Sequence, residues 1–396
     1  MNNSRRSFIR NSAMAAAGIS LLQQNIFAAV KKGELTGIQL YSVRTDMKAD
    51  PLGTLKQLSD MGYRHVEHAN YANRKFYGWS VSEFRKILNG FGMSMPSGHT
   101  VLDAKHWDAS KKDFTNEWKY TVEDAAAMGQ SFVISPWLEE SKRKSMGDLK
   151  SFMEVFNRSG EFCKKFGMKF GYHNHDFEFS EKVEGKVLYD IILAETDPNL
   201  VMQQLDIGNM LNGGAKAVEV MQQYPGRFES MHVKDEIKAT EGHEPFESTI
   251  LGKGVVPIKT IIDLGRASGT KHFIIEQESY QGKTPMECAE EDINIMKKWG
   301  YKTGIITGLL LFSLGSFLFV PAANHQSYEY FLVALFVIAC GLTILETAAN
   351  PYVSALGEPS TATQRLNLAQ SFNGLAVALA PAIGARVILT KGHSDI

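Results

Sequence analysis

The chain is poor in cysteine and nearly balanced in charge. Its 396 residues include three cysteines, Cys163, Cys288 and Cys340, which are too few and too scattered for a disulfide framework. The 42 basic and 43 acidic residues give a formal net charge of −1 without a basic stripe, so we expect no nucleic-acid partner. No GxGxxG motif follows the first predicted strand, which disfavours a dinucleotide-binding, doubly wound sheet.

The N-terminus has the pattern of an export signal. Ser4–Arg10 reads SRRSFIR and precedes an apolar run, Ala13–Leu22, and small residues at Ala28 and Ala29. Adjacent arginines followed by such a run are typical of the twin-arginine route. We therefore predict that residues 1–30 are a twin-arginine signal and that the protein is exported to the periplasm.

From Leu35 onward, short β-rich segments alternate with segments of helical period. The predicted strands are Gly37–Val43, Tyr63–His68, Met93–His99, Gln130–Trp137, Met168–His175, Val201–Asp206, Phe228–Lys234 and Lys271–Glu278. The predicted helices are Pro51–Met61, Ser80–Phe91, Lys112–Met128, Asp148–Phe166, Val187–Glu195, Gly214–Gln223, Pro257–Ser268 and Pro285–Trp299. This alternation predicts an α/β fold, a (β/α)8 TIM barrel over residues 31–300.

Ionisable residues collect where these strands end, which is where such a barrel places its active site. The fifth to eighth strands end with His173, Asp206, His232 and Glu276. This nitrogen and oxygen donor set predicts a divalent metal site for Mn, Zn, Co or Mg. The second and third strands end near Glu67 and His99, which are candidate acid/base or substrate-binding groups. His175 shares a strand face with His173 and is a further candidate.

Several motifs resemble one superfamily when they are taken together. They are GIQLYSVR, GYRHVEHA, YHNHDFEF, LDIGN, MHVKDE, LGKGVVP and IIEQE. Residues 35–300 thereby resemble the xylose isomerase-like TIM barrels, a group of sugar phosphate isomerases and epimerases. The ketose epimerases of that group hold their metal with Glu, Asp, His and Glu, and the last three match Asp206, His232 and Glu276.

The remaining ligand position departs from the epimerase pattern. It falls on His173, so the resemblance leaves open whether His173, His175 or Glu178 is the fourth ligand. A YHxH strand is similar to that of inosose dehydratases, which favours elimination chemistry. The resemblance to endonuclease IV, a DNA-cutting relative with more metal ligands, is weaker.

The resemblance implies a metal-dependent isomerase or epimerase that acts through an enediolate on a keto or aldo sugar. Glu276 or His175 would take the proton, with Glu67 and His99 as further acid/base candidates. Expected substrate-binding residues are Lys234, Trp137, Asn209 and Glu178. Export favours a free sugar over a sugar phosphate.

Two other functions stay open at this point. One is a keto-sugar lyase or dehydratase, either inosose dehydratase-like or a 3-keto-glycoside eliminase. The other, of a different class, is a membrane-anchored sugar-binding or transport-related protein. The glycine-rich loop Leu251–Pro257 either contacts a substrate oxyanion or forms a tight turn.

After residue 300 the composition changes to that of membrane segments. Gly304–Ser327 carries no charge, and Tyr330–Leu345 and Leu366–Leu389 are further apolar runs. A span needs ~20 apolar residues, so residues 301–396 are predicted to form an all-α fragment of about three transmembrane helices. The membrane is then an expected partner.

This tail resembles the fucose and glucose–galactose permeases of the major facilitator superfamily. The motifs are ILETAANPYVSALG and RLNLAQSFNGLA. The resemblance implies that Glu346 is the proton-coupling acid and that Gln370 and Asn373 lie near the sugar. Only a few of the family's helices are represented, so we expect no transport and interpret the chain as a fusion near Lys298–Thr303. A membrane anchor is the alternative.

Overall fold

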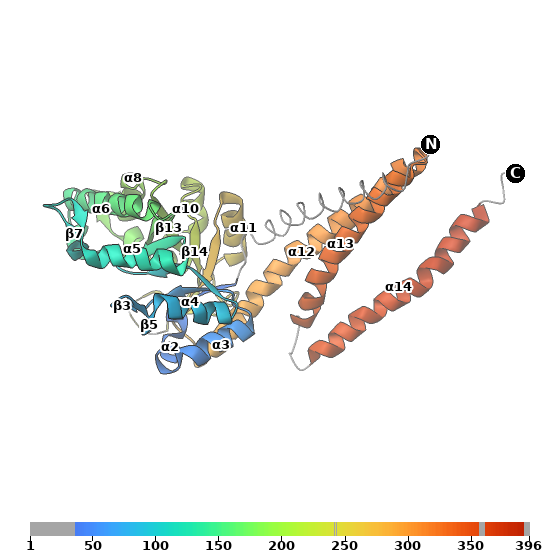
Figure 1. Ribbon diagram of the computed structural model, residues 1–396, viewed down its shortest axis with the longest axis horizontal. Helices are drawn as coiled ribbons and strands as arrows, with labels where there is room; N and C mark the ends of the chain where they lie inside the picture. Colours follow the sequence, from blue (N-terminus) through green and yellow to red (C-terminus); the bar gives the residue numbers. More distant parts are fainter. Residues whose placement is uncertain (1–35, 241, 243, 356–360, 392–396) are drawn as a thin grey trace. The chain divides into compact units, whose positions relative to one another are not determined.

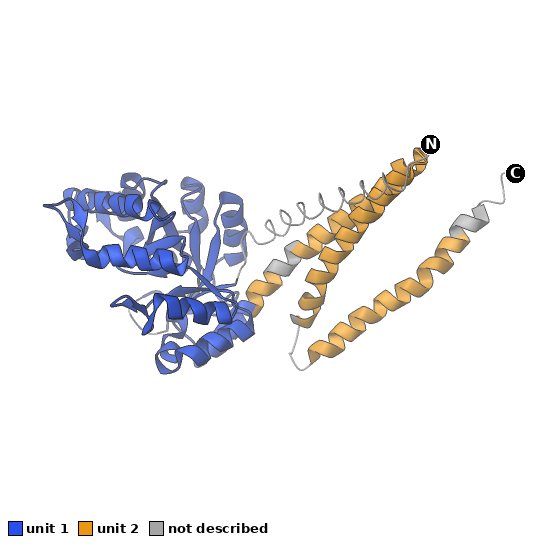
Figure 2. Cartoon of the chain, viewed as in Figure 1, with its two compact units in different colours: residues 1–293 blue, residues 294–396 orange. Residues whose placement is uncertain are grey.

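The computed structural model describes residues 36–240, 242, 244–355 and 361–391 (Figure 1). The chain divides into two compact units, residues 1–293 and residues 294–396 (Figure 2). The predicted export signal, residues 1–30, lies outside the described residues.

Unit 1 is a closed barrel of eight parallel strands surrounded by helices (Figure 1). The strands are β1 (Gly37–Gln39), β2 (His65–His68), β6 (Ser94–His99), β9 (Phe132–Ser135), β10 (Lys169–His173), β13 (Val201–Asp206), β14 (Ser230–Val233) and β17 (His272–Ile275). They pair in chain order, and β1 pairs with β17 to close the barrel. Each lies inside one predicted strand, so the predicted barrel is confirmed.

The barrel helices also fall where the helical period predicts them. They are α3 (Pro51–Met61), α4 (Val81–Gly90), α5 (Asn116–Met128), α6 (Met146–Lys164), α8 (Leu188–Glu195), α10 (Ala217–Gln223), α11 (Ile258–Ser268) and the beginning of α12 (Pro285–Asn324). In α3, Pro51 takes the first helical position, the Asp50 side chain accepts from the Gly53 amide at 3.0 Å, and Gly62 ends the helix at φ 105°. These are the capping residues that sequence rules favour.

Shorter elements follow the strands at the barrel mouth. They are a 3₁₀ turn (Leu40–Val43), α2 (Arg44–Ala49), α7 (Phe177–Ser180) and α9 (Ile207–Asn212). A hairpin of β15 (Asp235–Lys238) and β16 (Phe246–Thr249) follows β14. One small sheet has three strands, β3 (Tyr71–Ala72), β4 (Lys75–Phe76) and β5 (Trp79–Ser80). Two further sheets have two strands each, which are β7 (Trp107–Asp108) with β8 (Asp113–Phe114) and β11 (Lys182–Val183) with β12 (Lys186–Val187).

Five strands end earlier than predicted. They are β1, which stops at Gln39, β9 at Ser135, β10 at His173, β14 at Val233 and β17 at Ile275. At β10 the structure shows the reason. Asn174 Nδ2 donates to the Asp206 carbonyl and Asn174 Oδ1 accepts from the Asp206 amide, each at 3.0 Å, so the side chain replaces the backbone hydrogen bonds that would continue the strand. His175 consequently lies beyond the strand, not on it as the alternation predicted.

Aromatic side chains fill the space between the barrel and α5 and α6. Trp118, Phe156, Phe170 and Tyr172 are fully buried. The Trp118 indole donates to Ser159 Oγ at 3.0 Å, so its polar edge is satisfied inside the core. This packing fixes β10, whose end carries the site residues.

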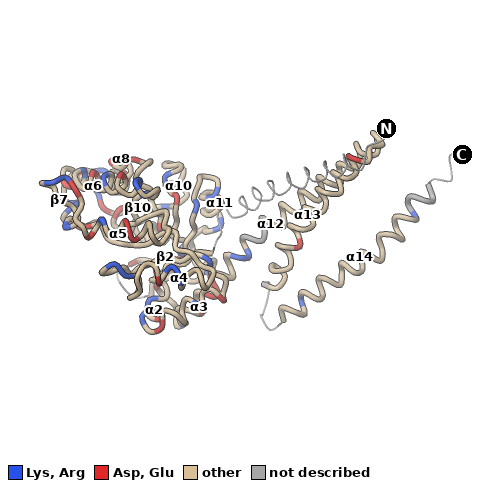
Figure 3. The backbone as a smooth tube through the Cα atoms, in the orientation of Figure 1, with Lys and Arg blue, Asp and Glu red and all other residues tan. Residues whose placement is uncertain are grey.

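Unit 2 contains helices that are long and apolar enough to cross a membrane. The candidate spans are Pro285–Asn324 (α12, which runs across the boundary between the units), Tyr328–Ser354 within α13 (Tyr328–Ala355) and Ala362–Arg386 within α14 (Ala362–Lys391). Figure 3 shows few charges on α13 and α14. Within this unit α12 and α13 approach closely at glycine, since a Cβ on Gly341 would lie 2.5 Å from the Phe312 nitrogen. Small residues permit such contacts between membrane helices.

Candidate metal centre

Four side chains from neighbouring strands meet at the mouth of the barrel. His173, Asp206, His232 and Glu276 each offer one donor atom, and these atoms lie within 4.8 Å of one another. All four residues are buried. They come from the carboxyl ends of β10, β13 and β14 and from the residue after β17. The structure therefore brings together the four residues that the sequence suggested as metal ligands.

His232 is held between carboxylates on both of its ring nitrogens. Its Nε2 lies 2.6 Å from Glu67 Oε1, and its Nδ1 lies 3.1 Å from Glu276 Oε2 and 3.7 Å from Asp206 Oδ2. Burial lowers the pKa of His232, but Glu276 and Glu67 raise it well above its usual value. Nδ1 is the nitrogen that faces the cluster, and Glu67 orients the ring through Nε2, as carboxylates do behind metal-binding histidines.

Asp206 supplies a buried oxygen that makes no hydrogen bond to the described residues and has only long ion-pair contacts, at 3.7 Å to His232 Nδ1 and 3.9 Å to Lys234 Nζ. Its Oδ1 accepts from the amides of Gly208 at 2.9 Å and Asn209 at 2.7 Å. Within the described part of the chain, Oδ2 is buried and makes no hydrogen bond. Burial raises the pKa of Asp206, but Lys234 and the nearby imidazoles lower it below its usual value. An ionised oxygen without a hydrogen bond is costly to bury. Together with Asp206, the two imidazoles and the Glu276 carboxylate make a set of two nitrogen and two oxygen donors, which fits a divalent cation.

Glu67 lies at the centre of a hydrogen-bond network beneath this cluster and is fully buried. Its carboxylate accepts from Gln39 Nε2 at 2.9 Å, Gln204 Nε2 at 2.8 Å, His232 Nε2 and the Ser97 hydroxyl, and it lies 3.1 Å from His99 Nε2. Burial raises the pKa of Glu67, whereas His99 and His232 lower it well below its usual value. This placement favours a role in orienting His232 over the predicted contact with substrate.

Gln204 is a site residue that the sequence analysis missed. Its Nε2 donates to Glu67 and to Ser230 Oγ at 3.1 Å. Its Oε1 therefore accepts, from His99 Nε2 at 2.7 Å and from His173 Nδ1 at 3.1 Å. That contact leaves His173 Nε2 as the unprotonated nitrogen, and burial lowers the pKa of His173 well below its usual value. A neutral imidazole is the form that binds a metal. The sequence held one signal for this residue, which is a polar amide side chain within the otherwise buried strand VMQQLD.

The sequence left three candidates for the fourth metal ligand, and the positions of two of them, His175 and Glu178, favour the third, His173. His175 lies outside the cluster, with its ring 5.2 Å from Trp137 and stacked 5.9 Å from Phe177. Glu178 is fully buried and accepts hydrogen bonds from Tyr172 Oη and, at 2.8 Å, from the His175 amide. Both therefore support the turn after β10. Burial lowers the pKa of His175 to about 4 and raises that of Glu178 to about 8.

Lys234 is the basic group beside the cluster. Its Nζ donates to Asn209 Oδ1 at 3.1 Å and to Glu278, and it lies 3.6 Å from Glu276 Oε2. Burial lowers the pKa of Lys234, but Asp206 and the two glutamates raise it well above its usual value. Trp137 is 42% exposed and presents an aromatic face to solvent near His175. These positions suit the predicted substrate contacts of Lys234, Asn209 and Trp137.

The glycine-rich loop is held by a carboxylate of the protein itself. Asp235 accepts from the amides of Gly252 at 2.7 Å, Gly254 at 3.0 Å and Val256 at 3.1 Å. These donors are the ones that a substrate oxyanion would need. Of the two interpretations left open by the sequence, the geometry favours the tight turn.

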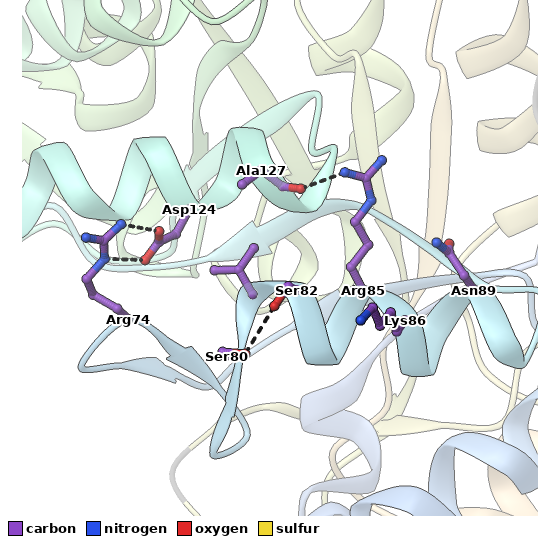
Figure 4. A pocket seen from close by; sticks show the side chains of 9 residues that line it. Arg74, Ser80, Ser82, Arg85, Lys86, Asn89, Asp124 and Ala127 are labelled. Atoms are coloured by element: carbon purple, nitrogen blue, oxygen red, sulfur yellow. Dashed lines mark hydrogen bonds and ion pairs between the residues drawn. The ribbon is translucent and has the colours of Figure 1, made fainter.

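A hollow of about 550 Å³ lies outside the barrel, against α4 and α5 (Figure 4). Its arginines are engaged by the protein. Arg74 binds both oxygens of Asp124, at 3.1 and 2.7 Å, and Arg85 donates to the Ala127 carbonyl at 2.9 Å. It shares no residue with the metal cluster, and we assign it no function.

Of the three residues that resemble functional positions of the permeases, Gln370 and Asn373 lie together in unit 2, and Glu346 does not join them. Gln370 donates to Asn350 Oδ1 at 2.9 Å and accepts from Asn373 at 3.1 Å, which joins α13 and α14. Glu346 is exposed on α13. The permease-like pair Gln370 and Asn373 is thus together, while Glu346 lies apart from their hydrogen bonds.

Because His68 is buried, we expect the free energy of unfolding to depend measurably on pH. Its imidazole crosses Gly98 on the neighbouring strand, where a Cβ would lie 1.8 Å from the ring. Burial lowers the pKa of His68 from 6.5 to about 3. The unfolded chain therefore binds the proton more tightly, and the stability present above pH 6.5 is lost as pH falls toward 3. Between pH 7 and pH 5 we expect this group to remove ~2 kcal/mol.

The His68→Gln variant checks this expectation. Its unfolding midpoint should fall less than that of the wild-type protein between pH 7 and pH 5 in thermal unfolding followed by circular dichroism. Equal losses in the two proteins would contradict the assignment.

Comparison with protein families agrees with the barrel fold of unit 1 and with the apolar helices of unit 2. Residues 55–299 match the family described as "Xylose isomerase-like TIM barrel", and residues 294–392 match the "Major Facilitator Superfamily". A solved sugar phosphate isomerase/epimerase from Parabacteroides distasonis ATCC 8503 is similar, with 26% identity, a TM-score of 0.56 and coverage of 66% of this chain and 92% of that one.

Curated relatives match the two regions separately. An inosose dehydratase from Clostridium perfringens is 34% identical over 189 residues, covering 45% of this chain and 62% of the relative. An L-fucose-proton symporter from Escherichia coli (strain K12) is 54% identical over 97 residues, covering 24% of this chain and 22% of the relative. The chain thus spans less than a quarter of the symporter's length.

Proposed function

Since the chain belongs to the xylose isomerase-like TIM barrel family, we propose that unit 1 is a metal-dependent sugar isomerase or epimerase. Its substrate is a keto or aldo sugar, and its intermediate is an enediolate. The observation that carries the proposal is the buried cluster of His173, Asp206, His232 and Glu276, in which one oxygen of Asp206 makes no hydrogen bond to the described residues.

The proposed roles follow from position. His173 Nε2, Asp206 Oδ2, His232 Nδ1 and Glu276 would hold Mn, Zn, Co or Mg. A bound divalent ion polarises a sugar carbonyl and acidifies the adjacent C–H bond. Glu276 or His175 accepts that proton. Isomerisation returns it to the neighbouring carbon, whereas epimerisation requires a second acid/base group that delivers a proton to the opposite face. Lys234 and Asn209 hold substrate oxygens, and Trp137 stacks on the ring.

Elimination is the second candidate, and the histidine at position 173 favours it. Epimerisation needs acid/base groups on both faces of the sugar, and the ketose epimerases use a glutamate where this chain has His173. An elimination requires one base that takes the α proton and an acid that protonates the leaving group. His99 and His175 flank His173, at ring separations of 4.8 and 5.2 Å. The similarity to inosose dehydratases supports this alternative.

Unit 2 is proposed to associate the protein with a membrane without transporting a sugar. Its candidate spans would anchor the chain by length and composition. Transport requires two complete halves that rock around a midplane site, and the match covers less than a quarter of a symporter. A membrane-anchored sugar-binding protein, the alternative of another class, would lack turnover but retain sugar binding.

Product analysis in heavy water tests the proposal. The full chain in detergent, with added Mn or Zn, is incubated with free aldoses, ketoses and 3-keto-glycosides. Deuterium at the carbon next to the carbonyl of an isomerised or epimerised product supports the isomerase, whereas an unsaturated product or released aglycone supports elimination. Absence of exchange and of product with every sugar would reject both enzymes.

A further inference from the structure

Glu236 is a buried carboxyl group to which no role above has been assigned. It follows Asp235 in β15, and only 1% of it is exposed. Both carboxyl oxygens are buried without a hydrogen-bond partner among the described residues. Leaving a polar group unpaired in a protein interior is destabilising, and an apolar side chain of similar size would avoid this cost. Such a group requires an explanation.

The carboxyl of Glu236 lies at the barrel mouth, beside the metal cluster. A Cβ built on Gly208 would lie 2.4 Å from Glu236 Oε1 and 2.8 Å from Lys234 Cγ. Gly208 is in the first turn of α9, two residues after Asp206. Glycine therefore leaves room there for the glutamate, and the unpaired oxygens lie next to the substrate contacts assigned to Lys234 and Asn209.

The charges around this position are mainly negative. Lys234 is already engaged by Glu278 and lies near Glu276 and Asp206, at 3.6 and 3.9 Å. Glu236 adds a further carboxyl group to this surrounding. A phosphate or carboxylate on the substrate would meet acidic groups and a lysine that is already paired, and like charges at close range are repulsive. A hydroxyl group would meet an unpaired acceptor.

We propose that Glu236 determines substrate specificity by hydrogen-bonding a hydroxyl group of an uncharged sugar, so that the site takes free sugars in preference to sugar phosphates. The inference rests on the proposed function, because it concerns the same barrel mouth. Burial raises the pKa of Glu236 to about 8, so its neutral carboxyl can both donate to and accept from a hydroxyl. The repulsion of a phosphate comes from the other carboxylates near Lys234, which are Asp206, Glu276 and Glu278.

Binding measurements test this inference independently of turnover. The full chain in detergent is titrated with glucose, fructose and inositol and with their phosphate esters, and binding is followed by ligand-observed NMR. The wild-type protein should bind at least one free sugar about tenfold more tightly than its phosphate ester. Tighter binding of every ester, or binding of no ligand, would overturn the inference.

Two variants locate the effect at Glu236. Glu236→Met should weaken binding of the free sugar about tenfold, which is the effect of losing one hydrogen bond. The same variant should raise the thermal unfolding midpoint. Glu236→Gln should keep most of the binding. Glu247→Gln, on the same hairpin, is the matched control and should change neither. Unchanged affinity in Glu236→Met would show a purely structural glutamate.

Failure of the proposed function has a different signature. If the protein binds free sugars through Glu236 but gives neither deuterium exchange nor product, the specificity inference stands and the enzyme assignment fails. If it turns over sugar phosphates as well as free sugars, the enzyme assignment stands and the inference about Glu236 fails.

Discussion

Replacing His173 with alanine is expected to lower the affinity for a divalent ion by about a hundredfold or more. His173 contributes one of the four donor atoms that lie within 4.8 Å of one another, and Gln204 leaves its Nε2 free to bind. Loss even of a group that only orients a ligand costs ~10–100-fold in metal affinity, so loss of a ligand should cost at least as much. Competition with a fluorescent chelator measures the change.

His175→Ala is the matched control for this prediction. His175 lies two residues further on and outside the cluster, so the ion should bind with little change while turnover falls. The reverse result, with the ion lost from His175→Ala and kept by His173→Ala, would contradict the ligand assignment and make His175 the fourth ligand.

Replacing Glu67 with alanine should produce the largest loss of stability. The carboxylate accepts hydrogen bonds from four side chains, lies within ion-pair distance of His99 and is fully buried. Removing one partner from a buried charged network costs ~3–5 kcal/mol. Because the pKa of Glu67 is lowered in the folded protein, its contribution is present above its unfolded pKa and is lost as pH falls through the folded value. Thermal and urea unfolding at pH 7 measure the loss.

Glu219→Ala is the control for this loss, because Glu219 is an exposed partner of Lys216 at 3.0 Å. Exposed ion pairs contribute little to stability, so this variant should unfold like the wild-type protein. Glu67→Gln separates the two roles of the residue. It should fold better than Glu67→Ala and still bind the metal ~10–100-fold more weakly, because an amide orients His232 poorly. Normal metal binding by Glu67→Gln would contradict the orienting role.

The strand and helix pattern predicts the fold well because short strands that are buried on both faces alternate with longer helices that bury one face. The error at the strand ends has a local cause. Alternation continued the fifth strand to His175, but the Asn174 amide pairs with the Asp206 backbone and ends the strand at His173. A side chain that replaces a backbone hydrogen bond has no signature in periodicity.

The candidate site was predictable only where ionisable residues end strands. His173, Asp206, His232 and Glu276 were found because barrel topology places those ends together. Gln204 and Glu236 were missed. One is an amide inside a strand and the other an acid in a hairpin, and the role of each depends on contacts with residues that are distant in the sequence. The export signal and the boundaries at residues 30 and 300 stay predictions.

The most direct test of the central claim is the metal content of the full chain beside that of His232→Ala. His232 Nδ1 faces both carboxylates of the cluster, so we predict about one tightly held divalent ion per wild-type chain and none in the variant. Mass spectrometric metal analysis after dialysis against a weak chelator gives both values. Equal metal in the two proteins, or no metal in either after loading with Mn or Zn, would contradict a metal centre at the barrel mouth.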